Sequence, residues 1–382
     1  MKLSFAQLKS IVADYVSANK ISYATFEITR DNTALLVDKI AKIFTLDTSF
    51  IDKLEMFEGE ELSFGKTIEE WQQDLMLPEA YSSSGDGAMS PHDPTYRPAF
   101  YSYTLGRKVI PTTIRNNDIE RAVHFEEQFV ELVAMKSKRL YDSVAVWRYE
   151  VKREILAKLI GLVAGVKTGA SAYATNQNYS VGAYVKSGSP SQYGVVVKPI
   201  TSGASDTNSW ANAKANGYVI VLDLERELAV PVDTSTGEAF VKAIKELAEI
   251  SSDISEGHSL NGNTLGASEG LVLLLKQGVM PSIQVDTLAG AFQKEELAMP
   301  VEIKVIKDFG SDNTNVFAML VDRRGVRLHN TYKAVRENFN GAGDFLNLFY
   351  HSEDTGFVSR NTFVCVIRPS AWYGILEFKP LS

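Results

Sequence analysis

The chain has 382 residues, of which 45% are hydrophobic and 23% are charged. These proportions are close to those of average globular proteins, so they exclude a disordered or collagen-like chain. The net charge is −8, from 39 basic and 47 acidic residues, and an acidic chain lacks the electrostatic signature of a protein that binds nucleic acid or an anionic membrane. The length predicts about two or three domains.

The cysteine content and the hydropathy bear on two further classes, namely disulfide-stabilised proteins and proteins with a signal peptide or a transmembrane helix. Cys365 is the only cysteine, so a disulfide within the chain cannot stabilise the fold. The first residues lack the apolar core of a signal peptide, and no run approaches the ~20 apolar residues of a transmembrane helix. We therefore expect a soluble protein that is made in a reducing compartment.

Two short helical segments are predicted within residues 1–55. Apolar residues recur at a spacing of three to four in each segment, as they do on one face of a helix. Because polar stretches join the segments, we expect an extended arm with helical pieces. The apolar positions are Phe5, Leu8, Val12 and Val16 in the first segment and Leu35, Leu36, Ile40 and Ile43 in the second.

A long projecting hairpin is predicted next. Its two arms are residues 63–76 and 98–113, and the second arm alternates apolar and polar residues as a half-buried strand does. The stretch 80–98 between them is rich in glycine, proline and serine, which favour turns. An acidic patch precedes the first arm, and it consists of Glu55, Glu58, Glu60 and Glu61.

A single long helix is predicted from Phe125 to Val163. Acidic residues lie at its start and basic residues dominate later, which complements the helix dipole. Such a helix would be roughly 55–60 Å long. Two helices broken near Ser137 are the alternative. The apolar face consists of Leu140, Val144, Trp147, Val151, Ile155, Leu159 and Leu162.

The remaining elements mix helices and strands without a regular βαβ repeat, which predicts the α+β class. Residues 168–217 hold only four charged residues and predict short strands and loops in a surface insertion. A helix is predicted over 236–254 with Thr236 as its N-cap, and a short helix over 282–292 is expected to be capped near Asp286. Strands are predicted over 218–232, 269–280, 301–309, 315–322, 325–330, 345–353 and 357–369.

Recognisable catalytic and cofactor-binding motifs are missing. The five histidines do not form an HExxH or HxH motif, and the single cysteine cannot form a CxxC motif, so a zinc site is not expected. The chain also lacks a Walker-type phosphate loop and a GxSxG nucleophile elbow. The sequence therefore predicts no enzyme and no cofactor.

Two groupings of ionisable residues remain open. Asp223, Glu225 and Glu227 alternate along a predicted strand, so their carboxylates could share one face and bind a cation. A solvated strand face has the same composition and is favoured. A second grouping could be a general base with orienting acids, but a strand end that runs into a loop is favoured. It consists of His351, Glu353 and Asp354.

An aromatic and basic cluster begins just before the second arm of the predicted hairpin and continues into it. Such residues can stack on bases, but they also form contacts between subunits, and the acidic net charge favours the contact. The cluster consists of Tyr96, Arg97, Phe100, Tyr101, Tyr103 and Arg107.

Several segments, in order along nearly the whole chain, resemble the major capsid proteins of small podoviruses, which are short-tailed phages with protein-primed replication. No single motif is highly specific, so the collinear order carries the resemblance. Residues 168–217 do not take part. The segments are MKLSFAQLKS, NTALLVDKIAKIF, FGKTIEEWQQDL, NNDIERAVHFEEQFVELVAM, ILAKLI, STGEAFVKAIKELA, VDTLAGAFQ, VIKDFG, AMLVDRRGV, LHNTYKAVRENFN and LFYHSEDTGFVSRNTFVCVI.

The resemblance implies the tailed-phage capsid fold, also called the Hong Kong 97 fold. It implies an N-terminal arm, an E-loop, a P-domain with a spine helix around 125–164, and an A-domain, with an insertion of uncertain placement. The N-terminal arm would be residues 1–55 and the E-loop residues 56–112. The P-domain would combine residues 113–167 and 341–382. The A-domain would be residues 215–340, and the insertion residues 168–214. Some members of this fold join subunits through Lys–Asn bonds, but we expect none here, although Lys66 lies on the predicted hairpin.

The function implied is that of a major capsid protein, which assembles with itself in hexamers and pentamers into an icosahedral or prolate shell around phage double-stranded DNA. A scaffolding protein and a portal are the expected partners, without a membrane or sequence-specific DNA binding. The chain would be made in the bacterial host cytoplasm and reside in the virion capsid. The alternatives are an encapsulin-type nanocompartment, a tail or other structural phage protein, and a carboxylate-metal enzyme.

Contacts between subunits are expected at two kinds of residue. The acidic patch should meet a basic neighbour, such as the bases late in the long helix, and aromatic residues should act as anchors. The expected contact residues are Glu58, Glu60, Glu61, Trp71, Arg97, Phe100, Tyr101, Tyr103, Arg148, Lys152 and Arg153.

Overall fold

The computed structural model describes residues 50–62, 68–73, 81, 83, 96–101, 103–115, 126–189, 191–264, 266, 270–279 and 301–370. The predicted arm helices, most of the stretch 80–98, Lys66 and the helix near Asp286 lie outside these residues. The chain divides into two compact units. The first comprises Met1–Gly65, Thr104–Ile155 and Arg327–Gly356, and the second comprises Lys66–Tyr103, Leu156–Val326 and Phe357–Ser382.

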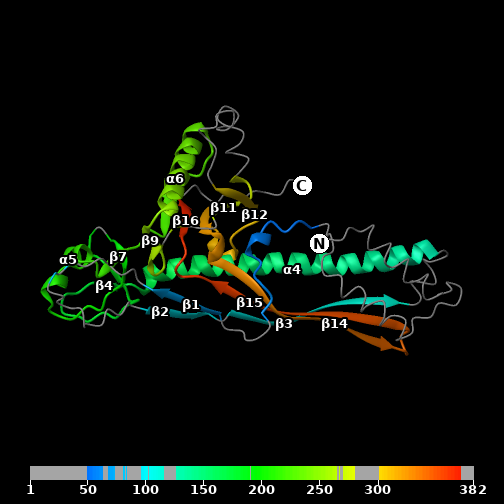
Figure 1. Ribbon diagram of the computed structural model, residues 1–382. Helices are drawn as coiled ribbons and strands as arrows, with labels where there is room; N and C mark the ends of the chain where they lie inside the picture. The colour runs from blue at the N-terminus through cyan, green and yellow to red at the C-terminus, as the bar shows by residue number, and fades with distance from the viewer. Residues whose placement is uncertain are drawn as a thin grey trace. The chain divides into compact units, whose positions relative to one another are not determined.

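The long helix α4 (Glu126–Gly169) is drawn in Figure 1. Its residues up to Ile155 belong to the first unit, and those from Leu156 belong to the second. Its 44 residues are continuous, so the prediction of one long helix is confirmed and a break near Ser137 is wrong. The helix also continues past Val163, because Val163 and Val166 are buried and hold its last turns in place. Among the described residues, no helix combines the length and apolar character needed to cross a membrane.

In the first unit, α4 packs on a three-stranded sheet with the order β14–β15–β3. The strands β14 and β15 extend well beyond the lengths predicted from the sequence. The bounds are Tyr103–Arg115 for β3, Val326–Asn340 for β14 and Phe345–Val358 for β15. A core cluster joins the helix to the sheet, and it consists of Leu140, Val144 and Tyr350 with Ile110 and Val335 against it.

The second unit is built around a mixed sheet in which the described strands have the order β12–β11–β13–β16–β8. β11 pairs parallel with β12 and antiparallel with β13, and β16 pairs antiparallel with β13 and parallel with β8. The strand bounds are Glu225–Leu228 for β8, Leu271–Lys276 for β11, Glu302–Ile306 for β12, Ala318–Asp322 for β13 and Val364–Pro369 for β16.

Helix α6 (Thr234–Ser252) covers one face of this sheet (Figure 1). Phe240, Ile244 and Leu247 lie one or two turns apart on α6 and pack against alternate residues of β11 and β16, including Leu273 and Cys365. Val272 and Leu274, which point the other way, are also buried. Burial on both faces explains why β11 reads as a continuous apolar run.

Asp233, not the predicted Thr236, is the N-cap of α6. The Asp233 carboxylate accepts a hydrogen bond from the backbone N–H of Thr236, and the Thr236 hydroxyl accepts one from the N–H of Asp233. This reciprocal pair is a capping box. The prediction was wrong because Thr236 occupies the third position of the first turn.

Two predicted strands are each broken. The strand predicted over 218–232 is divided into β7 (Val219–Val221) and β8, which belong to different sheets. The break occurs where the N–H of Asp223 donates to the carbonyl of Gly257 at 2.8 Å. The strand predicted over 357–369 is likewise divided between the end of β15 and β16. Between them, the N–H of Ser359 donates a hydrogen bond to the carbonyl of Gly325.

The predicted hairpin is confirmed in part. β1 (Ile68–Gln73) and β2 (Tyr96–Tyr101) pair antiparallel, with Ile68 opposite Tyr101 and Gln73 opposite Tyr96. The second predicted arm is not one strand, because β3 joins the sheet of the first unit. Glu70 connects β1 to the segment that follows β15, because its carboxylate accepts a 2.5 Å hydrogen bond from the Ser359 hydroxyl.

The predicted insertion contains short strands, as expected, and also a core of its own. Its sheet has the order β4–β5–β6–β7, and buried residues including Val185, Val196 and Ala213 pack together. The elements of the insertion are β4 (Ser171–Ala172), β5 (Tyr184–Lys186), β6 (Tyr193–Val196), η2 (Ser205–Thr207) and α5 (Trp210–Ala215). The remaining described elements follow later in the chain, namely β9 (Ser255–Ser259), β10 (Gly262–Thr264), η5 (Ser311–Asn313) and η6 (Arg323–Gly325).

Candidate functional site

The segment of residues 52–62, which includes the whole acidic patch, lies along β14 in the first unit. It contains the short helix η1 (Glu55–Phe57), whose Phe57 is fully buried together with Leu54. Glu58 forms a parallel bridge with Leu328. The N–H groups of Gly59 and Leu62 then donate to carbonyls of β14 at 2.9 Å. Main-chain hydrogen bonds therefore fix the register of the segment on the strand.

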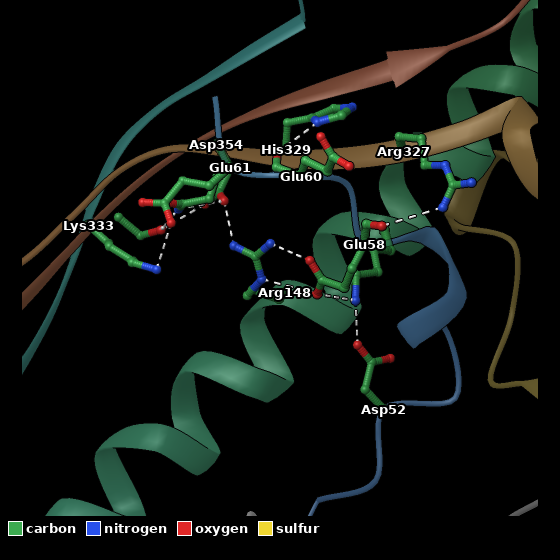
Figure 2. Close-up of polar contacts among 12 residues, drawn as sticks. Asp52, Glu58, Glu60, Glu61, Arg148, Arg327, His329, Lys333 and Asp354 are labelled. Atoms are coloured by element: carbon green, nitrogen blue, oxygen red, sulfur yellow. Dashed lines mark hydrogen bonds and ion pairs between the residues drawn. The ribbon is translucent and has the colours of Figure 1, made fainter. Parts of the chain in front are cut away.

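Two basic residues of α4 bind the same segment from the other side (Figure 2). Arg148 donates two hydrogen bonds to the Glu58 carboxylate, from Nε at 3.2 Å and Nη2 at 2.5 Å. Lys152 lies four residues further, on the same helix face, and its Nζ is 2.5 Å from both Asp52 and Glu58. Lys152 has no exposed side-chain surface. The two carboxylates therefore offset the free-energy cost of burying its charge.

β14 adds three more contacts from alternate positions of the strand (Figure 2). Arg327 donates to the carbonyl of Met56 at 2.9 Å. Nδ1 of His329 lies 2.9 Å from the carbonyl of Glu60, and because a carbonyl only accepts, Nδ1 carries the proton. The Lys333 amine lies 2.9 Å from the Glu61 carboxylate.

Asp354 completes the network from β15. Its carboxylate accepts a 2.5 Å hydrogen bond from Arg148 and further ones from Asn330 and Ser352. The grouping of His351, Glu353 and Asp354 therefore lies inside a long strand, and its interpretation as a strand end is wrong.

The remaining members of that grouping do not build a catalytic base. Glu353 lies 3.5 Å from Arg107, whose guanidinium carbon also lies 4.2 Å from the centre of the Tyr332 ring. Nδ1 of His351 is buried without a hydrogen-bond partner in the described structure, so neither acid orients this imidazole.

Burial and neighbouring charges shift the pKa values of Glu58 and Arg148 in opposite directions. Burial raises the pKa of the Glu58 carboxyl, but the hydrogen bonds and charges of Arg148 and Lys152 outweigh it and lower that pKa below its usual value. Burial likewise lowers the pKa of Arg148, but Glu58 and Asp354 raise it above its usual value. Burial raises the pKa of nearby Tyr350 to about 12. All three groups therefore keep one protonation state at neutral pH.

The second carboxylate grouping, Asp223, Glu225 and Glu227, does not converge on a cation site. Glu225 lies between Lys167 at 2.5 Å and Arg368 at 2.9 Å. Burial raises the pKa of Glu225, yet hydrogen bonds from these two bases lower it overall. Only 9% of the Glu225 side chain is exposed, so the favoured solvated face is wrong at this position. Among the described residues, no cluster of His, Cys, Asp and Glu is placed to hold a metal ion.

The other expected contact residues have different surroundings. Trp71 on β1 is 63% exposed, and its indole N–H is 3.4 Å from Glu69. Arg153 lies over the ring of Tyr149, with 5.8 Å between its guanidinium carbon and the ring centre. The Glu60 carboxylate has no partner among the described residues. Four expected residues have a described backbone but no described side chain, namely Arg97, Phe100, Tyr101 and Tyr103.

Several residues of the network were not predicted from the sequence. Arg327, His329 and Lys333 share alternate positions of a strand, which is a usable signal for a common face. Asp52 and Asp354 carry no such signal, because Asp52 meets Lys152 across 100 residues and Asp354 meets Arg148 across 206 residues.

Comparisons with known proteins agree with this architecture. Two solved structures share the fold, although their sequence identity is low. A chain in the capsid of Staphylococcus phage Andhra is 13% identical with a TM-score of 0.54, and the alignment covers 85% of this chain and 86% of that one. A chain in the structure of the head fiber and inner core protein gp22 of native bacteriophage P68 is 12% identical with a TM-score of 0.51, and the alignment covers 84% and 87%, respectively.

The structural likeness shows the fold alone, whereas the comparison with family models identifies the family. No curated protein matches the chain in sequence. The family model of Phi29-like phage major capsid proteins, however, matches residues 3–367. Because this match spans nearly the whole sequence, the chain belongs to the family of Phi29-like phage major capsid proteins.

Proposed function

We propose that this capsid protein assembles, as hexamers and pentamers, into a closed shell that encloses phage double-stranded DNA without sequence-specific contacts. The net charge of −8 supports this role, because a strongly basic inner wall would hold DNA by counterion release and oppose packaging. The protein is structural, acts without a cofactor and catalyses no reaction. It is made in the host cytoplasm, with a scaffolding protein and a portal as its assembly partners.

The exposed face of the β1–β2 hairpin is the contact surface that we propose between copies. Side chains alternate along a strand. Glu70 points back to Ser359 of its own chain, so Trp71 points the other way, and its 63% exposure agrees with this. A large exposed aromatic residue of this kind is typical of an interface anchor.

Substitution of Trp71 tests this surface. Trp71→Ala should leave the thermal unfolding of the subunit unchanged but reduce the yield of closed shells seen by negative-stain electron microscopy. Val109→Ala is the matched control, because Val109 is an exposed apolar residue of another strand, β3. Shells at the wild-type yield from Trp71→Ala, or an equal loss from Val109→Ala, would contradict a specific role for this face.

The content of purified particles tests the enclosed DNA separately. Particles isolated from infected cells should release double-stranded DNA after denaturation of the shell. Closed shells that carry no nucleic acid would instead support an empty compartment of the encapsulin type.

A further inference from the structure

Three asparagines of the chain directly precede a glycine, namely Asn216, Asn261 and Asn340. Glycine has no Cβ atom, so its backbone nitrogen has open access to the side-chain carbonyl carbon of the residue before it. Attack by that nitrogen displaces the side-chain amide, and this reaction is one reason why asparagine is a thermolabile residue. The sequence presents all three pairs alike, so the structure decides which of them reacts.

Asn340 is the last residue of β14, and the turn of residues 341–344 joins it to β15. The whole stretch from Asn340 to Asp344 is exposed. The side-chain oxygen of Asn340 accepts hydrogen bonds from the N–H groups of Ala342 at 3.1 Å and Gly343 at 2.9 Å. Two N–H donors on one carbonyl oxygen stabilise the negative charge that develops there when a nucleophile attacks the carbon. The turn therefore activates this side chain.

The two nitrogens that take part in the reaction at Asn340 are not held elsewhere. Among the described residues, neither the side-chain nitrogen of Asn340 nor the backbone N–H of Gly341 donates a hydrogen bond. A hydrogen bond from either nitrogen would have to break before the reaction, at a cost in free energy. This barrier is therefore missing at Asn340.

Asn216 differs because both of its reacting groups are held. Its side-chain nitrogen donates to the carbonyl of Asp206 at 2.9 Å, and the N–H of Gly217 donates to the carbonyl of Lys214 at 3.1 Å. Asn216 is also the C-cap of α5, so rotation of the Gly217 peptide would disrupt the helix end. The fold therefore protects Asn216 although the residue is exposed.

Asn261 is held by its side chain and by the main chain around it. Its side-chain nitrogen donates to the side-chain oxygen of Asn361 at 2.5 Å, and its N–H donates to the carbonyl of Arg360 at 3.1 Å. Gly262 pairs with Ser259 between β10 and β9, and its carbonyl accepts a hydrogen bond from the Ser259 hydroxyl. The fold therefore protects this pair as well.

We propose that Asn340 is a self-modification site, at which the folded chain converts asparagine to aspartate and isoaspartate. The Gly341 nitrogen gives its proton to a solvent base and bonds to the side-chain carbonyl carbon of Asn340. The side-chain nitrogen takes up a solvent proton and leaves as ammonia. Water then opens the resulting cyclic imide. Cleavage of the bond from nitrogen to the side-chain carbon gives aspartate, and cleavage of the main-chain bond gives isoaspartate.

Each such event changes the turn between β14 and β15. It adds a carboxylate to a turn that already carries the exposed Asp344, and the isoaspartate product lengthens the main chain there. The reaction does not depend on self-assembly. Because every copy carries the same turn, however, the negative charge of a shell increases with its age at one defined place on each subunit.

Peptide mapping by mass spectrometry of the native full-length chain tests this assignment. Deamidation at the three asparagine–glycine pairs is followed over time at mildly alkaline pH, with a parallel sample in guanidinium chloride. The three pairs should react at similar rates in the denatured sample. In the native sample, Asn340 should react at least as fast as when denatured. Asn216 and Asn261 should react about tenfold more slowly than when denatured, because their hydrogen bonds must break first.

Gly341→Ala is the matched variant. A Cβ atom at residue 341 would make only an ordinary contact of 3.6 Å with the Phe339 ring, so the variant should fold. It should slow the reaction at Asn340 and leave the rates at the other two pairs unchanged, because a methyl group hinders the attacking nitrogen.

Three outcomes overturn the assignment. The first is a native chain in which Asn216 or Asn261 reacts as fast as Asn340, since the hydrogen bonds would then not select the site. The second is an Asn340 that stays intact in the native chain but reacts in guanidinium chloride. The third is an unchanged rate at Asn340 in Gly341→Ala, which would exclude attack by the nitrogen of residue 341.

Discussion

Arg148 donates a 2.5 Å hydrogen bond to Asp354, a carboxylate without exposed side-chain surface that lies 206 residues away in the sequence. Arg148→Met would leave this buried carboxylate without its cation, although Asn330 and Ser352 would still donate to it. We expect a loss of about 3–5 kcal/mol in the free energy of unfolding, measured by urea denaturation.

Arg139→Met is the matched control for this substitution. Arg139 also lies on α4 but is exposed, and exposed substitutions usually change stability by less than about 0.5 kcal/mol. Equal unfolding midpoints for the two variants would contradict a structural role of the Arg148–Asp354 pair.

The lowered pKa of Glu58 predicts a specific loss of stability in acid. The unfolded chain should bind a proton at Glu58 near the usual value of 4.5, whereas the folded chain binds it only at lower pH. The ion pairs of Glu58 therefore contribute fully above 4.5, and their contribution is lost as the pH falls through the folded value. Thermal unfolding of Glu58→Gln should consequently fall less steeply with acidification than that of the wild type.

Glu60→Gln is the control for the acid series, because its carboxylate has no partner in the described part of the chain. It should reproduce the wild-type curve of melting temperature against pH. If Glu58→Gln and the wild type lose stability in parallel below pH 4.5, the ion pairs of Glu58 do not contribute to folding.

The close approach of Gly59 to His329 predicts a coupled pair of substitutions. A Cβ atom at residue 59 would overlap the imidazole ring, so Gly59→Ala should cost about 1–3 kcal/mol of unfolding free energy. In a His329→Ala background the ring is absent, and the same substitution should cost much less. A double-mutant cycle measured by urea denaturation gives the coupling, and additive costs would show that the two residues do not meet.

The capping box of α6 predicts a second non-additive pair. Asp233→Ala and Thr236→Ala should each destabilise the protein by about 1 kcal/mol, since each removes a hydrogen bond at the helix start. Because the two side chains serve each other, the double variant should lose less than the sum of the single losses. Unfolding monitored by circular dichroism measures this, and a fully neutral Asp233→Ala would instead support Thr236 as the cap.

The long helix could be predicted because its signal is local and repeated. Apolar residues from Leu140 to Leu162 keep one spacing over many turns without a proline, and the structure buries most of that face. The break between β7 and β8 had no local signal, since the residues around Asp223 continue the strand pattern. It depends on a backbone hydrogen bond to Gly257, whose positive φ of 78° places its carbonyl there.

The candidate site was predictable only as a set of complementary charges. The acidic patch and the bases of α4 stand out in the sequence, and Glu58 does meet Arg148 and Lys152, although within one chain. The contribution of β14 could not be located, because it depends on how far-separated segments come together. Asp233 is different, since an aspartate directly before a helical segment is itself a recognisable N-cap signal.

The buried position of Cys365 has a consequence for the life cycle of the subunit. The residue lies in β16 without exposed surface, and burial raises the pKa of its thiol to about 12, so the folded chain offers oxidants and thiol reagents neither access nor a thiolate. A shell built from this chain can therefore leave a reducing cell for an oxidising medium without oxidation of its thiols. Any cysteine engineered on its surface would be the one thiol open to labelling, and the reaction of Cys365 would report unfolding.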